Sequence, residues 1–311
     1  MNITRRGFIY SAAALVALRA TRQITLAEDS KPASPPPFQG KVEAIKLEND
    51  LYAFTGAGGN STAYFNKNRL LMIDSGIPGR GDDLLMEAGK LAPDARHKTL
   101  LNTHWHFDHA GGNDAFAAAG YQIIGSTACR ERLGQTINLE DMGMTAQPLP
   151  EALRPSVTFD QTLMIHEPTS VRLTKVAPAH TDGDVIAFIE KYNILITGDL
   201  IFNGMYPVID RATGGSLDGM IAAAKMLLTL GDAKTRIIPG HGPVGDKSVI
   251  SNHLELLTKV HEILSPIGAK KATMDEVLAA KPLEPLDEKW GRGFLRSPVF
   301  TKMAYGQWLT K

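Results

Sequence analysis

The sequence has a single cysteine and no excess of either charge. Cys129 is the only thiol among 311 residues, so neither an internal disulfide nor a zinc site built from several thiolates is possible. Lys plus Arg equal Asp plus Glu at 33 each, which leaves no large basic field for holding nucleic acid. We therefore predict no nucleic-acid partner, and a metal bound here would need histidine and carboxylate ligands.

The charge is unevenly placed at the N-terminus. Residues 1–27 contain four arginines and no acid. Arg5 and Arg6 directly precede an apolar run at 8–18, which is shorter than the ~20 residues that span a bilayer. This pattern resembles the twin-arginine export signal of bacteria. We predict a signal peptide over 1–27, transport by the twin-arginine export machinery to the periplasm, and no stable membrane anchor once the signal is removed.

The rest of the chain has the pattern of an α/β protein. Residues 28–40 are proline-rich and are predicted to form an extended linker. Beyond them strand and helix patterns alternate over a main domain at 41–264, and residues 265–311 are predicted to be a helical extension. Strands are expected at 42–47, 51–55, 61–65, 70–73, 98–102, 157–165, 171–176, 185–190 and 194–197, with another ending at 237–238. Helices are expected at 81–91, 113–119, 217–230, 247–264, 274–280 and 298–309.

The densest group of reactive side chains follows the expected strand at 98–102. Three imidazoles and one carboxylate occupy six positions, at His104, His106, Asp108 and His109. Because residues two apart in extended backbone point the same way, His104 and His106 can bind one ion. Asp108 and His109 lie beyond a turn and point elsewhere, which indicates two adjacent metals. Such ligands suit zinc, and also iron, manganese or cobalt.

Three further candidate ligands stand at the ends of later strands. They are His180, Asp199 and His241. Each alone is typical of a turn residue or a helix cap. Because functional sites of α/β proteins collect at strand termini, we expect these three to join the first four.

In order and spacing, these seven residues and the segment 72–76 resemble the metallo-β-lactamase superfamily over roughly residues 41–264. The resemblance implies an α/β fold with four αβ/βα layers, two mixed sheets face to face with helices outside, in a single catalytic domain. It also implies one metal held by His104, His106 and His180, a second held by Asp108, His109 and His241, and Asp199 as the bridge. Asp74 is expected either to hold a ligand histidine by its other ring nitrogen or to be a turn residue.

Two positions separate the chain from one group of β-lactam hydrolases. In the pattern of that group, cysteine stands in place of Asp199 and a lysine that binds the substrate carboxylate follows three residues later, where this chain has Phe202. A bridging aspartate resembles instead glyoxalase-type thioesterases, quorum-signal lactonases and exported hydrolases linked to quinoprotein or sulfur metabolism. The sequence favours the superfamily more strongly than antibiotic hydrolysis.

The expected activity is hydrolysis of a small-molecule lactam, lactone, ester or thioester by a dinuclear zinc site. Hydroxide bridging two metals would attack the carbonyl, because bound metal brings the pKa of water to ~7. Asp108 would orient this nucleophile and relay its proton to the leaving group. Asn203 and Tyr206 are candidate substrate contacts, although an aromatic residue there packs equally well in a core.

Two other functions fit the same residues. One is an iron-dependent oxidoreductase of the same fold, similar to persulfide dioxygenases. The other is a non-catalytic metal-binding component of a periplasmic quinoprotein or sulfur redox system. Outside the seven candidate ligands, His253 and His261 are predicted to be surface residues of the helix at 247–264, and Cys129 is predicted to be a packing residue.

Overall fold

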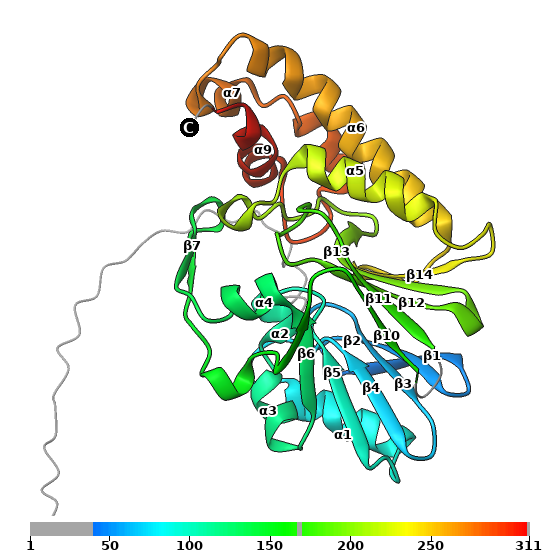
Figure 1. The fold of residues 1–311 in the computed structure, drawn as a ribbon. Helices are drawn as coiled ribbons and strands as arrows, with labels where there is room; N and C mark the ends of the chain where they lie inside the picture. Colours follow the sequence, from blue (N-terminus) through cyan, green and yellow to red (C-terminus); the bar gives the residue numbers. More distant parts are fainter. Residues whose placement is uncertain (1–39, 167–169, 310–311) are drawn as a thin grey trace, which may run out of the picture. The chain divides into compact units, whose positions relative to one another are not determined.

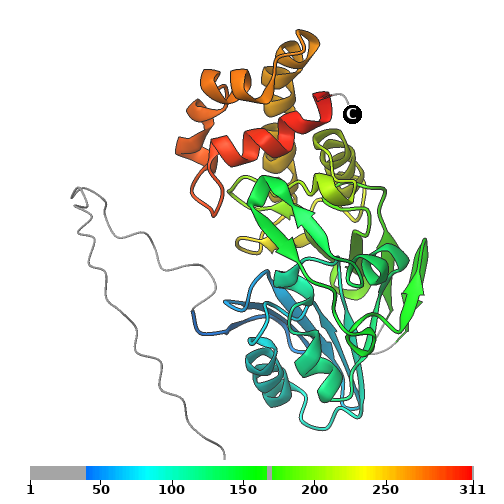
Figure 2. The same ribbon diagram turned by 90° about the vertical axis from the view of Figure 1, so that its left-hand side faces the viewer.

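The computed structural model describes residues 40–166 and 170–309. The predicted signal peptide and all of the predicted linker except Gly40 lie outside these ranges. Two β-sheets face each other, and helices cover their outer faces (Figures 1 and 2). This arrangement is the predicted four-layer α/β sandwich. In the described ranges, we find no helix whose length and apolar character would let it cross a membrane.

The first sheet has seven strands in the order β1-β2-β3-β4-β5-β6-β9. Neighbours pair antiparallel from β1 to β4 and parallel from β4 to β9. In the parallel part Ile73 lies opposite Leu101, so β4 and β5 end at the same edge. The strands are β1 (Glu43–Glu48), β2 (Leu51–Thr55), β3 (Ser61–Phe65), β4 (Arg69–Ile73), β5 (His97–Leu101), β6 (Gln122–Ser126) and β9 (Val157–Phe159).

The second sheet has five strands in the order β10-β11-β12-β13-β14. All neighbours pair antiparallel except β13 and β14, which are parallel. A separate hairpin of β7 (Ile137–Leu139) and β8 (Met144–Ala146) lies outside both sheets. The five strands are β10 (Thr162–Ile165), β11 (Val171–Lys175), β12 (Val185–Ile189), β13 (Ile194–Phe202) and β14 (Arg236–His241).

Strand alternation builds the three apolar interfaces between the layers. On β4, Leu71 and Ile73 point into the interface between the sheets, whereas Leu70 and Met72 point to the opposite face and pack with Leu84 of a helix. Because successive side chains of a strand point to opposite faces, β4 places apolar side chains on both of its covered faces. Each such side chain contributes roughly 1.5–3 kcal/mol when it is fully buried.

The helices flank the sheets in two groups. Helices α1 and α3 cover the seven-stranded sheet, and α5, α6 and the C-terminal helices cover the five-stranded one (Figure 1). Side-chain caps begin α5, α6 and α7, at Ser216, Asp246 and Thr273. The helices are α1 (Gly81–Leu91), α2 (Phe107–Ala110), α3 (Asn113–Ala118), α4 (Thr127–Arg132), α5 (Leu217–Leu228), α6 (Lys247–Ala269), α7 (Met274–Ala280), α8 (Asp287–Trp290) and α9 (Ser297–Tyr305).

The predicted strand at 157–165 is wrong as a single element. It divides into β9, which pairs with β6 in the first sheet, and β10, which pairs with β11 in the second. The chain crosses between sheets at residues 160–161, where Thr127 donates a hydrogen bond to Asp160 Oδ2 at 2.9 Å. Two polar residues inside an extended pattern do not show that the pairing partner changes. The sequence also did not predict β6, α4 or the β7–β8 hairpin.

The sequence predicted the ends of one strand and one helix too early in the chain. β13 continues to Phe202, beyond the expected end at residue 197, and its pairing with β14 shifts register around Gly198, which has a φ of 51°. Asp199 therefore lies inside a bulged strand rather than at its end. Helix α6 continues through Pro266 to Ala269, so the domain boundary predicted at residue 265 falls within a helix.

His253 is not on the surface, as the sequence predicted, but buried at 1% exposure. Its Nδ1 lies 3.2 Å from the carbonyl oxygen of Phe202, and its Nε2 has no hydrogen-bond partner. Burial lowers the pKa of His253 to about 4, although the Phe202 carbonyl favours the charged ring. A histidine whose folded pKa lies below its unfolded value stabilises the fold above the unfolded pKa, and this stabilisation is lost as the pH falls through the folded pKa.

We expect His253→Leu to reduce the acid sensitivity of folding. Between pH 8 and pH 5 the unfolded state takes up the proton that the folded state excludes, which costs about 2 kcal/mol of unfolding free energy. Urea denaturation at both pH values should show that the variant loses about this much less stability than the parent. The matched control is His261→Leu on the same helix, where the side chain is 39% exposed. Equal pH dependence in parent and His253→Leu would contradict the assignment.

Candidate metal centre

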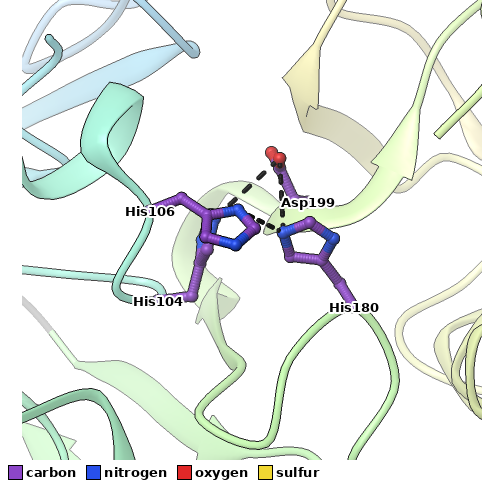
Figure 3. A group of neighbouring side chains, drawn as sticks. All are labelled: His104, His106, His180 and Asp199. Carbon is purple, nitrogen blue, oxygen red and sulfur yellow. Dashed lines mark hydrogen bonds and ion pairs between the residues drawn. The ribbon is translucent and has the colours of Figure 1, made fainter. Parts of the chain in front are cut away.

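A first ligand group is formed by His104, His106, His180 and Asp199, whose ligand atoms all lie within 4.8 Å of one another. Figure 3 shows the three imidazoles and the carboxylate converging from separate segments. His104 and His106 lie in the loop after β5, His180 in the loop between β11 and β12, and Asp199 on β13. All four are buried.

A second ligand group is formed by Asp108, His109 and His241. The first two are adjacent on the short helix α2, and His241 is the last residue of β14. His241 Nε2 lies 3.1 Å from Asp108 Oδ2 and 3.4 Å from His109 Nε2. Helix α2 begins after His106 and turns the chain between the two groups, which is the change of direction expected from the sequence.

Asp199 lies between the two groups. Its Oδ2 is 3.6 Å from His180 Nε2 in the first group, and its Oδ1 is 3.0 Å from His109 Nε2 in the second. A Cβ atom on Gly240 would lie 1.9 Å from Asp199 Oδ1, so only glycine lets β14 approach this carboxylate. The seven predicted residues are thus brought together, and Asp199 touches both halves.

The polar atoms of this centre suit bound cations. His106 Nδ1 and His180 Nε2 lie 2.9 Å apart. His104 Nε2 is buried without a hydrogen-bond partner. Unpartnered buried polar atoms are costly unless something satisfies them. Imidazole and carboxylate donors in this number fit two divalent cations such as Zn²⁺.

Outer contacts orient the imidazoles. Asp74 Oδ2 lies 2.8 Å from His109 Nδ1, which is the contact expected for the first of its two predicted roles. Asp74 also accepts hydrogen bonds from the backbone N–H and the hydroxyl of Thr103, and its φ is 62°. A non-glycine residue held in this conformation by such contacts is typical of a functional position.

Asp210 plays the same part for the first ligand group, and the sequence did not predict it. Its Oδ2 lies 3.1 Å from His106 Nε2. Asp210 also accepts a hydrogen bond from the backbone of Thr213, at the start of the 3₁₀ turn η4 (Arg211–Thr213). The local sequence around Asp210 therefore indicates only an N-cap of this 3₁₀ turn. His180 Nδ1 donates to the carbonyl oxygen of Val208 at 2.8 Å.

Asn203 and Tyr206, the predicted substrate contacts, do not face the centre. Tyr206 is buried in the core, stacks on Phe300 and donates its hydroxyl to the Leu283 carbonyl at 3.3 Å. Asn203 donates to the Pro243 carbonyl at 2.8 Å. The Tyr206 ring packs against the C-terminal helices, so Tyr206 is a core residue, which was the alternative interpretation of its aromatic side chain.

The two groups differ in their electrostatics. Burial lowers the pKa of His104 well below its ordinary value and that of His180 to about 4, so both rings are neutral. Burial disfavours charge on His241 as well, but Asp199 and Asp108 outweigh it and raise its pKa to about 9. The pKa of Asp108 moves to about 2, because His109 and His241 outweigh its burial.

The pattern that decides the family spans both sheets. The sequence model of the metallo-beta-lactamase superfamily matches residues 54–241. This range is more than half of the chain, and it contains all seven candidate ligands. The chain belongs to the metallo-beta-lactamase superfamily.

Relatives within this superfamily have different names. The acyl-coenzyme A thioesterase MBLAC2 of Gallus gallus is 26% identical over 191 residues, covering 56% of this chain and 68% of that protein. A metallo-beta-lactamase type 2 of Bacillus sp. (strain 170) is 21% identical, covering 70% and 83%. The solved metallo-beta-lactamase from Pontibacter korlensis has a TM-score of 0.57 at 21% identity, covering 70% and 99%. This last likeness shows the shared fold.

We expect Asp74→Asn to weaken zinc binding. Loss of a carboxylate that orients a ligand histidine typically lowers metal affinity 10–100-fold, and the effect should fall on the second ligand group, which contains His109. Competition against a fluorescent zinc chelator measures both binding steps. Asp82→Asn, at an exposed position of α1, is the control. Parental affinity in Asp74→Asn would show that the carboxylate does not support the centre.

Proposed function

We propose that this protein is a dinuclear metal-dependent hydrolase that adds water to a carbonyl group of a lactone, ester, thioester or lactam. The observation that carries the proposal is the position of Asp199 between the two adjacent ligand groups. Its Oδ1 lies 3.0 Å from His109 Nε2, and its Oδ2 lies 3.4 Å from His241 Nε2 and 3.6 Å from His180 Nε2. This arrangement is the one that a bridging carboxylate requires. Membership of the superfamily supports the same conclusion.

The residues would divide two cations between them. His104, His106 and His180 would hold the first, Asp108, His109 and His241 the second, and Asp199 both. Two cations here, zinc by the donor set and otherwise iron or manganese, would acidify water and polarise the substrate carbonyl. The protein's share is to keep His104 and His180 neutral by burial and to orient His106 and His180 through their contacts with Asp210 and the Val208 carbonyl.

Asp108 is the candidate proton carrier. It lines the cavity next to the centre, and its low pKa, set by His109 and His241, keeps it ionised at neutral pH. An ionised carboxylate can accept a hydrogen bond from the attacking water and orient it. It would take the proton that the water loses on adding to the carbonyl, and would then give that proton to the leaving oxygen, sulfur or nitrogen. The adjacent His241 ring limits the movement of this carboxylate through their 3.1 Å contact.

Removal of metal should abolish hydrolysis. We expect chelation, or the double variant His104→Ala with Asp199→Ala, to lower kcat/KM by about 1,000-fold or more, because metals supply several kcal/mol of transition-state stabilisation at 1.36 kcal/mol per tenfold. A panel of acyl thioester, homoserine lactone, ester and β-lactam substrates measures the loss. His166→Ala, an exposed histidine outside both ligand groups, should retain the parental rate.

Three experimental outcomes would contradict the proposed hydrolase function. Turnover that survives complete chelation would exclude the metals from the reaction. One iron per chain together with persulfide oxidation would favour the oxidoreductase. Two bound metals with no turnover on any substrate of the panel would favour a binding component of a redox system.

We also propose that residues 1–27 direct export through the twin-arginine machinery to the periplasm, on the basis of Arg5, Arg6 and the apolar run that follows. Such a signal carries folded proteins. The double variant Arg5→Lys with Arg6→Lys should therefore leave the protein in the cytoplasmic fraction, whereas Arg19→Lys should not change its export. Immunoblots of fractionated cells measure this, and unchanged export of the double variant would exclude the twin-arginine route.

A further inference from the structure

A cavity of about 370 Å³ opens beside the candidate metal centre. Four residues of the two ligand groups form its inner end: His106, Asp108, Asp199 and His241. Cavities of this size are at the lower end of those that hold small ligands. The substrate of the proposed hydrolase must therefore place its carbonyl at this inner end and its remaining atoms against the other walls.

Those other walls are mostly apolar, and apart from Phe107 and Val208 they come from two segments outside the sheets. The β7–β8 hairpin with its 3₁₀ turn η1 (Glu140–Met142) contributes Leu139, Met142 and Met144. The C-terminal segment around the start of α9 contributes Phe294, Leu295 and Val299. Figure 2 shows the C-terminal helices, in orange and red, beside this green hairpin.

The charge of the cavity excludes one way of binding substrate. Among the described residues that line it, none is a lysine or arginine, and Asp141 is the only charged group outside the ligand groups. Asp141 is paired with Arg211, whose Nη1 lies 3.1 Å from its Oδ2. At position 202, where one group of β-lactam hydrolases is expected to have a carboxylate-binding lysine, this chain has Phe202, whose buried ring stacks on His241. The walls thus offer no free cation to a substrate carboxylate.

Exposed apolar side chains gather at the same place. In the described part of the chain seven large hydrophobic residues are exposed, and three of them, Phe107, Met144 and Phe294, line this cavity at 39% exposure each. Clustered apolar exposure is typical of a ligand-binding surface. The Phe294 ring lies 5.3 Å from the His241 ring, edge to face, so the apolar surface begins directly at the second ligand group.

We propose that this cavity binds the apolar acyl or alkyl group of an uncharged carbonyl substrate, with the β7–β8 hairpin and residues 294–299 as the surface that sets chain-length preference. The inference rests on the proposed hydrolase for the position of the carbonyl. It adds the substrate class: a neutral ester, lactone or thioester whose apolar chain adjoins the carbonyl, rather than one that presents an anion to the walls.

Binding to metal-free protein tests the cavity without catalysis. The fluorescent neutral probe N-phenyl-1-naphthylamine is bound to chelator-treated protein and displaced by primary alcohols from butanol to decanol. Each added methylene should tighten displacement about fourfold, which is 0.8 kcal/mol per buried CH₂ at 1.4 kcal/mol per tenfold, until the cavity is filled. Decanoate should displace the probe less well than decanol, because the cavity carries carboxylates and no free cation.

Two methionines of equal exposure provide the matched variants. Met144 lines the cavity at 39% exposure, and Met164 lies elsewhere on β10 at 37%. Met144→Gln should weaken decanol binding about threefold or more, because it places an amide against the alkyl chain. Met164→Gln should bind decanol as the parent does. In the metal-loaded enzyme, the same Met144 change should lower kcat/KM for long-chain esters more than for acetyl esters.

Several results would overturn the inference. They are an affinity independent of chain length, tighter binding of decanoate than of decanol, or equal behaviour of the two methionine variants. Sedimentation that shows a dimer dissociated by decanol would assign the apolar surface to a second copy of the chain instead. Because the displacement series uses metal-free protein, alcohol binding without any hydrolysis in the loaded enzyme would refute the hydrolase, whereas hydrolysis without chain-length preference would refute the apolar cavity.

Discussion

The structure depends on the mutual compensation of seven titratable side chains that are buried at one edge of two sheets. Any one of them alone would be expensive to remove from water. In the second ligand group, carboxylates and imidazoles compensate one another as ion pairs, which is why the pKa of His241 is raised and that of Asp108 lowered. In the first group burial lowers the pKa of His104 and His180, so these two rings are neutral, and His104 Nε2 keeps no hydrogen-bond partner.

The fold meets this constraint by giving each ligand a rigid support. The parallel pairing of β4 with β5 brings Asp74 to the loop that carries His104 and His109, and the parallel pairing of β13 with β14 brings Asp199 beside His241. Close packing at Gly240 and the bulge at Gly198 set the approach of these two strands. The interface between the sheets, filled by alternate side chains of both, then holds the two halves of the centre together.

The walls of the cavity have a different origin from the centre itself. The sheets carry the groups that suit metals, whereas the hairpin and the C-terminal segment carry the apolar surface beside them. Such a division lets the same reactive centre accept different substrates when only the peripheral segments change.

The sequence by itself indicated an α/β protein, most strands of both sheets and the four candidate ligands at 104–109, because strand periodicity and a dense run of imidazoles are local signals. His180, Asp199 and His241 were weak signals singly, and they joined the set, like the four-layer arrangement, through the family resemblance. Only the tertiary structure decided the rest. The pairing of β9 with β6, which divides residues 157–165 between two sheets, depends on a partner more than 25 residues away. The same is true of the burial of His253 and Tyr206 and of the contact of Asp210 with His106. The apolar cavity likewise joins residues 139–144 to residues 294–299. Local patterns report which side chains prefer burial, whereas the packing of distant segments decides what each buried or exposed group meets.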